Sequence, residues 1–162
     1  MAKKVTGFVK RNKLRAHLTD EEREILDLPR PEASEQHVNA IGWRLENMWP
    51  LAWVVGFDPA PPVGGMIDHE RIGALLEFLP RFDGSVADYA KTHTPRPLAE
   101  VDALEDLFYC AHNAVRSAQL GGDTVPGGFD PIIDGGVVHE RRHALTWCVS
   151  PGDTWDDTDL ST

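Results

Sequence analysis

Apolar residues recur at intervals of three and four along much of the chain, which is the spacing of amphipathic helices. No stretch of strict apolar and polar alternation is long enough to predict a secure strand. The strongest periodic segment lies between Pro97 and Gly121 and predicts a helix over about 99–120. Its apolar positions are Val101, Leu104, Phe108, Ala111, Val115 and Ala118. The fold class expected is therefore mainly α.

Capping residues and prolines delimit further helices. Thr19 and Glu22 form a capping box that opens a short helix closed before Pro29, and residues 29–34 are expected to form a loop. A helix is predicted over about 35–56. Pro50 lies inside it and lacks a backbone N–H, so a kink or restart is expected there. The apolar positions of this helix are Val38, Ile41, Leu45, Met48, Trp49 and Ala52.

The remaining segments predict three more helices and two long connections. Asp68 is placed to cap a helix that ends before Pro80, a short helix follows Ser85, and the last helix runs over about 138–149. Residues 121–136 contain six glycines and two prolines, and 58–65 is also rich in both, so both segments are expected to be extended. We therefore expect one irregular helical bundle of about five helices with long Gly/Pro-rich connections. Its expected core is Ile41, Leu45, Leu104, Phe108, Val115, Leu145 and Trp147.

Charge divides the chain into two unequal parts. The 162 residues carry a net charge of −10, yet residues 1–17 contain six Lys or Arg and no acid, which leaves 10 − 26 = −16 for the remainder. We expect 1–17 to be a flexible basic leader and 18–162 to be a single helical domain. An acidic domain repels phosphate backbones, which argues against nucleic acid and favours a basic protein partner.

Cysteine content and hydropathy indicate the compartment. Two cysteines are too few for a disulfide framework, and neither belongs to a Cys-x-x-Cys pair. The longest apolar run, 48–57, has ten residues and contains Pro50, which is about half of what a membrane-spanning helix needs. A cytoplasmic protein without membrane partners or cofactors is expected.

His139, Glu140 and His143 have the His-Glu-x-x-His spacing of zinc-dependent proteases. In that motif two imidazoles four residues apart hold one ion, and the Glu acts as a general base on the bound water. The two commonest arrangements of the third ligand are missing here, which leaves the aspartates of the C-terminal tail as the alternative. On a helical wheel, both histidines lie opposite the apolar face with Arg142 and Thr146, whereas Val137, Arg141, Leu145 and Cys148 share that face. No metal-ligating or catalytic residue is assigned, and a zinc-dependent hydrolase stays as the alternative function.

Several motifs occur together in an order typical of one family. The chain contains VPGGFDP at 125–131, GVVHERRHALTW at 136–147 and WDDTD at 155–159. Further motifs are Trp43-Arg44-Leu45-Glu46, Leu51-Ala52-Trp53 with Gly56, and Asp106-Leu107-Phe108-Tyr109 with His112 and Arg116. From about Leu18 to its C-terminus the chain resembles the uncharacterised bacterial family called domain of unknown function 4272. That family has no established activity, so the resemblance supports a fold more than a function.

The resemblance also bears on the zinc signature. The recurring core of the family's last motif matches Glu140, Arg141, Ala144, Leu145 and Trp147, while His139 and His143 occupy variable positions. The resemblance thus implies that the zinc signature is accidental. Cys110, Asn113 and Pro50 depart from the family pattern.

Arg141 on an apolar helix face is the most informative polar residue, because a guanidinium stays charged and needs acceptors if it is buried. Polar side chains on the other helices are expected to converge with it, either as a structural network or as a polar binding pocket. The candidate cluster is Arg44, Glu46, Asp106, Tyr109, His112, Arg116, Glu140 and Arg141, flanked by Glu105. The function expected is a non-enzymatic binding or protein-interaction domain.

Overall fold

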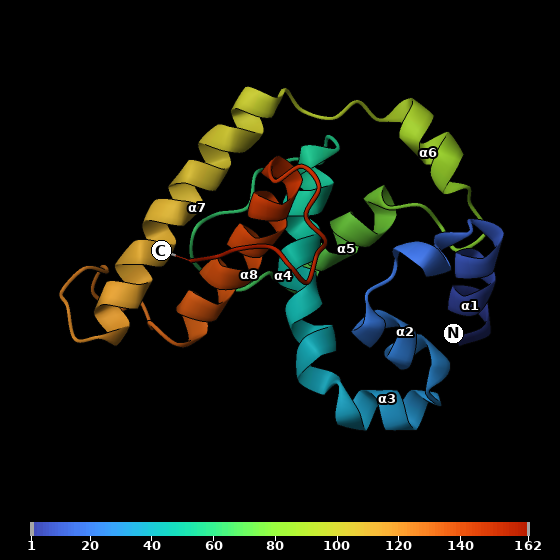
Figure 1. Ribbon diagram of the computed structural model, residues 1–162, viewed down its shortest axis with the longest axis horizontal. Helices are drawn as coiled ribbons and strands as arrows, with labels where there is room; N and C mark the ends of the chain where they lie inside the picture. Colours follow the sequence, from blue (N-terminus) through green and yellow to red (C-terminus); the bar gives the residue numbers. More distant parts are fainter. Residues whose placement is uncertain (1, 162) are drawn as a thin grey trace.

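The computed structural model describes residues 2–161, which form eight α-helices and one short 3₁₀ helix at Leu14–His17, with no strand among them (Figure 1). The mainly helical class is confirmed, with eight α-helices where about five were expected. In chain order they are α1 (Ala2–Arg11), α2 (Asp20–Asp27), α3 (Arg30–Gln36), α4 (Val38–Val54), α5 (His69–Phe78), α6 (Val86–Thr92), α7 (Leu98–Gln119) and α8 (Ile133–Val149). No helix in this described part has the length and apolar composition needed to cross a membrane.

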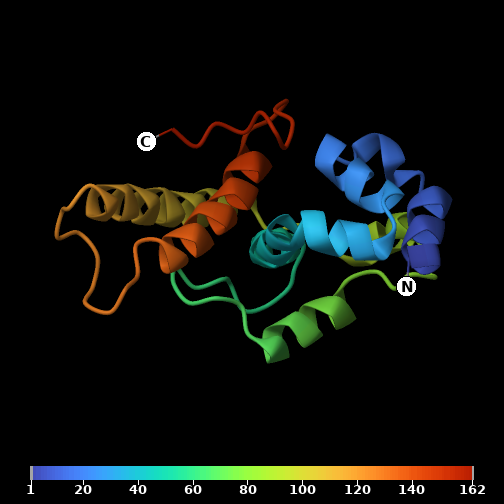
Figure 2. The same cartoon turned by 90° about the horizontal axis from the view of Figure 1, so that it is seen from below.

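Helix α8 lies between α7 and α4, and the main core fills both of its contacts (Figures 1 and 2). The buried residues of this core are Trp53, Val101, Phe108, Val115, Val138 and Leu145. A second cluster lies between α4 and α5 and consists of Trp49, Ala52, Phe57 and Leu75. Because α8 is covered on two sides, polar residues on both of these sides have to find partners inside the protein.

Two residues expected in the core are exposed to solvent over more than a third of their surface. Ile41 is 43% exposed because it lies on the N-terminal half of α4, away from the main core cluster. Trp147 is 38% exposed, and its ring meets that of Trp155 edge to face at a centroid distance of 5.6 Å. Phe108, Val115 and Leu145 are fully buried as predicted.

Proline signals were misleading at two places, since of the kink or restart expected at Pro50 the restart is absent, and a helix replaces the loop expected over 29–34. Helix α4 continues through Pro50, which is itself buried, so no restart occurs there. Helix α3 occupies most of the segment expected to be a loop, with Pro31 in its first turn. A first-turn proline is compatible with a helix because the N–H it lacks would have no helical partner.

Helix α8 begins at Ile133, five residues before the predicted start, and it includes Gly135 and Gly136. Both glycines stand where another helix approaches closely. A Cβ atom at Gly135 would lie 2.8 Å from Val115 Cγ1 on α7, and one at Gly136 would lie 2.6 Å from Trp43 Cη2 on α4. These glycines permit tight packing of α8, so their presence did not signal an extended connection here.

The basic N-terminal segment forms α1 and is docked on the rest of the protein. Asn12, directly after α1, donates to the Gly84 carbonyl at 3.3 Å and accepts from the Val86 N–H at 2.9 Å. The Phe8 ring contacts that of Phe82 edge to face at 6.3 Å. Of the segment 1–17 that was expected to be a flexible leader, Ala2–Arg11 and Leu14–His17 are helical, Asn12 and Phe8 contact residues 82–86, and Met1 lies outside the described residues.

The glycines predict opposite effects of alanine at two helical positions. Gly136→Ala should destabilise the protein by about 1–2 kcal/mol, because overpacking against Trp43 outweighs the better helix propensity of alanine. Gly42→Ala in α4, where a Cβ meets nothing within 4 Å, should stabilise it by up to about 1 kcal/mol. Urea unfolding of both variants measures the difference. Equal effects would show that α8 does not need a glycine at this contact.

Candidate functional site

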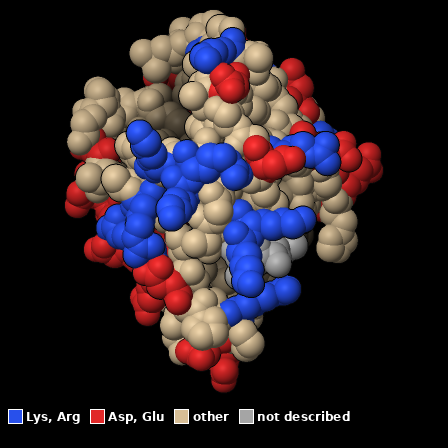
Figure 3. All heavy atoms as spheres, turned by 90° about the vertical axis from the view of Figure 1, so that its right-hand side faces the viewer, with Lys and Arg blue, Asp and Glu red and all other residues tan. Residues whose placement is uncertain are grey.

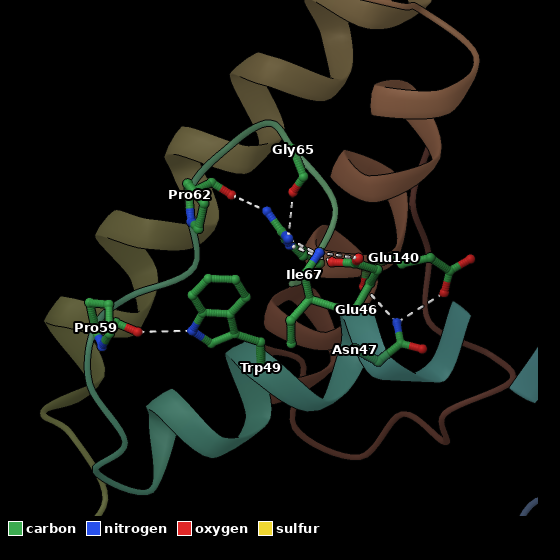
Figure 4. A network of polar contacts seen from close by, with 9 residues as sticks. Glu46, Asn47, Trp49, Pro59, Pro62, Gly65, Ile67 and Glu140 are labelled. Atoms are coloured by element: carbon green, nitrogen blue, oxygen red, sulfur yellow. Dashed lines mark hydrogen bonds and ion pairs between the residues drawn. The ribbon is translucent and has the colours of Figure 1, made fainter. Parts of the chain in front are cut away.

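Arg141 on α8 is fully buried and forms an ion pair with Glu46 of α4, which is 1% exposed. Its Nε and Nη2 atoms donate to Glu46 Oε2 at 3.0 and 2.6 Å (Figure 4). Its Nη1 atom donates to the Pro62 carbonyl at 2.5 Å, and Nη2 also donates to the Gly65 carbonyl at 2.9 Å. The guanidinium therefore holds one helix and two points of the α4–α5 connection together.

The partners of this ion pair are engaged as well. Glu46 Oε1 accepts from the Ile67 N–H at 2.8 Å, so both carboxylate oxygens have a donor. The Trp49 ring lies 5.0 Å from the Arg141 guanidinium carbon, and its Nε1 donates to the Pro59 carbonyl at 2.9 Å. All three side-chain nitrogens of Arg141 and both carboxylate oxygens of Glu46 thus have hydrogen-bond partners within the protein (Figure 4).

Glu140 extends the network toward α4. Asn47, which is 2% exposed, donates through Nδ2 to the Glu140 carbonyl at 2.7 Å and to its carboxylate at 3.0 Å. This bond pins the backbone of α8 beside the Arg141 ion pair. Asn47 was absent from the sequence prediction. Its one available signal is its position between Glu46 and the apolar run that begins at Met48.

A second polar cluster surrounds Arg142, which is 2% exposed on the α7 side of α8. Its Nη1 lies 2.6 Å from Nδ1 of His112 on α7 and donates to the Leu160 carbonyl at 3.1 Å. Its Nε lies 3.6 Å from Glu105 Oε1, and its guanidinium carbon is 4.6 Å from the Tyr109 ring centroid. The helical wheel placed Arg142 on a solvent-facing side because it assumed a single buried side of the helix. In the structure, other helices cover α8 on two sides.

The contact with Arg142 sets the protonation of His112. Arginine only donates, so His112 Nδ1 must accept and the ring proton resides on Nε2. Burial, then the charges of Arg142, His139 and Arg116, lower the pKa of His112 from 6.5 to about 4. His112 is thus a neutral structural acceptor near neutral pH. Burial likewise raises the pKa of the Cys148 thiol to about 11, which disfavours a nucleophilic role.

The His-Glu-x-x-His residues point to different partners. His143 Nε2 lies 2.9 Å from the Trp155 carbonyl, and the exposed His139 ring contacts the His112 ring edge to face at 5.5 Å. The Glu140 carboxylate is held by Asn47. Within residues 2–161 no three His, Cys, Asp or Glu side chains gather in an arrangement suited to a metal.

The structure separates the predicted polar cluster into parts. Glu46, Glu140 and Arg141 belong to the first network, while Tyr109 and His112 belong to the cluster around Arg142. The other three lie outside both: Arg44 pairs with Glu21 at 3.2 Å, Arg116 is exposed and donates to Gln119 at 2.9 Å, and Asp106 is exposed.

An open groove of about 860 Å³ lies between α1 and the end of α5, a feature that the sequence analysis did not predict. Helix α1 provides Lys3, Lys4, Gly7 and Arg11 on one side. The floor and the opposite side consist of Met48, Leu76, Leu79, Pro80, Arg81, Phe82 and Asp83. Figure 3 shows Lys and Arg side chains gathered across the face of the molecule that carries α1. The only signal in the sequence was the basic N-terminal segment.

Comparison with protein families identifies the chain as a member of the family called domain of unknown function (DUF4272), whose model matches residues 2–158. The match begins well before Leu18 and therefore includes the basic segment, which the sequence analysis had left outside the resemblance. No curated protein and no solved structure matches the chain.

Removing Arg141 alone should destabilise the protein strongly, and removing Glu46 as well should restore part of that stability. Arg141→Met should cost about 3–5 kcal/mol, because Glu46 is left buried without its cation. The double variant Arg141→Met with Glu46→Leu should lose less than the sum of the single variants. Arg116→Met on exposed α7 surface serves as a control, expected to change stability by less than about 0.5 kcal/mol. Additive losses in urea unfolding would contradict the coupling.

His112 predicts a pH dependence of stability. Its folded pKa of about 4 lies below the unfolded value of 6.5, so the unfolded chain binds a proton first as pH falls. The folded state should therefore lose about 2–3 kcal/mol relative to the unfolded state between pH 7 and pH 4.5 through this residue. His112→Asn, which keeps an acceptor for Arg142, should unfold with a flatter pH profile. Parallel profiles for the two proteins would exclude this role of His112.

Proposed function

We propose that this member of the DUF4272 family is a non-enzymatic interaction domain that binds a segment of a partner protein in the groove between α1 and α5. The observation that carries the proposal is the groove itself, about 860 Å³ in volume and lined by exposed cations around an apolar floor. Concave surfaces of this size that combine apolar area with a few charged groups are typical of binding sites. The proposed setting is the cytoplasm.

The distribution of polar groups supports a binding role more than catalysis. The buried side chains of Arg141, Glu46 and Asn47 bond mainly to one another or to the protein backbone. Their geometry suits the fixing of helix positions. Catalysis would instead need polar groups that face a substrate.

The zinc-dependent hydrolase is the weaker candidate. It requires His139 and His143 to share an ion with Glu140 beside it, yet His143 lies against Trp155 and Glu140 against Asn47. No observation favours it. A basic protein partner for the acidic remainder of the surface stays a separate prediction from the net charge of −10.

The proposal predicts position-dependent cross-linking in cells of the native host. A photoreactive benzoyl-phenylalanine at Leu76, which lines the groove and is 60% exposed, should give a discrete cross-linked product. The same residue at Leu120, which is 86% exposed but outside the groove, should not. Both variants are compared by gel electrophoresis of the tagged chain after irradiation.

Two further results bear on this experiment. The product at Leu76 should weaken when Lys4→Glu and Arg81→Glu are added, because both cations line the groove. Equal products at Leu76 and Leu120 would show that the groove is not the docking surface, and a product unaffected by the two charge reversals would show that its cations take no part in docking.

A further inference from the structure

The groove between α1 and α5 reverses the charge of the protein locally. The whole chain has 16 Lys or Arg against 26 Asp or Glu, whereas the groove has four cations, Lys3, Lys4, Arg11 and Arg81, against the single acid Asp83. The net charge of its lining is therefore 4 − 1 = +3, in a protein of net charge −10. A local field of this sign attracts anionic groups.

These four cations have no carboxylate partner in the part of the chain that the structure describes. None of them forms an ion pair with an Asp or Glu within residues 2–161. Arg11 donates to the Phe82 carbonyl, a contact that orients it and helps to hold α1 against the opposite wall. The groove thus presents oriented positive charge, and in this it differs from the Arg141 network, whose cation is neutralised inside the protein.

The floor of the groove is apolar. Met48, Leu79 and Pro80 line it, and Leu76 and Phe82 are 60% and 47% exposed. Exposed apolar side chains in a concave surface favour a ligand that carries apolar side chains of its own. A second hollow of about 400 Å³ between α4 and α5 is also largely apolar, but its described lining contains no Lys or Arg. Cations and apolar floor occur together at the first groove.

We infer that the groove receives a short acidic segment of a partner protein, with Asp or Glu side chains against the cations of the rim and apolar side chains on the floor. This inference rests on the proposed function and adds the chemistry of the partner. The acidic groups gain charge-assisted hydrogen bonds with Lys and Arg. The apolar side chains add burial, as in helices and peptides that dock in hydrophobic grooves.

The same features disfavour two other polyanions. A nucleic acid carries phosphates over a long distance, and these would meet the acidic surface beyond the groove. An anionic membrane surface is broad, whereas the cations here border a concavity whose floor it would leave unfilled. Both remain outcomes of the experiment below.

Selection from a phage-displayed library of random peptides, each about twelve residues long, tests the partner chemistry on the full chain. Enriched peptides should combine Asp or Glu with Leu, Ile or Phe. The best of them, synthesised with a fluorescent label, should bind Lys4→Glu/Arg81→Glu at least about tenfold more weakly than the wild type. A matched reversal outside the groove, Arg30→Glu/Lys91→Glu, should retain affinity within about threefold. Leu76→Ser should weaken binding at unchanged thermal stability.

The other outcomes separate the inference from the proposed function. Enriched peptides that are basic or uncharged, yet are weakened by Leu76→Ser, would overturn the acidic partner and leave the groove as a peptide site. If no selected peptide responds to either groove variant, both proposals fail. Binding of single-stranded DNA or phosphatidylserine vesicles, lost in Lys4→Glu/Arg81→Glu while no acidic peptide is enriched, would also overturn the inference. Equal losses of affinity in the groove reversal and in the control reversal would also overturn the inference, because the net charge of the protein would then account for the binding.

Discussion

Arg141 is a permanent cation at the centre of a small helical protein, and the packing around it follows from that charge. A buried guanidinium needs acceptors in its own plane, so α4 supplies Glu46 and the α4–α5 connection supplies the carbonyls of Pro62 and Gly65. The connection, which is rich in proline and glycine, is thereby held in one path. Helix α5 follows this path, because Ile67 just before it donates to the same Glu46.

Helix α8 carries a second buried guanidinium on its other side, and Arg142 gives α7 a similar anchor. His112 accepts from it and Glu105 lies near it, while the segment after α8 adds the Leu160 carbonyl. The two arginines therefore join α4, α7 and the C-terminal segment to one central helix. Buried ion pairs contribute less to net stability than to the choice of one arrangement, because their desolvation offsets much of their attraction. Register is the role that suits these networks.

Among the described residues, the three members of the His-Glu-x-x-His motif have separate partners. His139, Glu140 and His143 are each drawn to a different neighbour by the packing of α8 between two helices. The groove at α1 contrasts with them, because its cations border an open hollow. One wall of the groove is α1, which Arg11 and Asn12 attach to residues 82–86, more than seventy positions away in the chain.

Local patterns in the sequence were sufficient to predict the helical class, the long α7, the capped start of α2 and the need of a buried Arg141 for acceptors. These depend on periodicity, on side-chain caps and on the need of a buried charge for a partner, all of which are readable from neighbouring residues. Tertiary packing decided the rest. From the sequence, Gly135 and Gly136 predicted the end of a helix, whereas in the structure they allow α7 and α4 to approach α8 closely. Arg142 was likewise predicted to be exposed, whereas α7 covers it. Lys4 and Arg81 line the same groove although they are far apart in the sequence. No local sequence pattern indicates which distant segments a folded chain brings together.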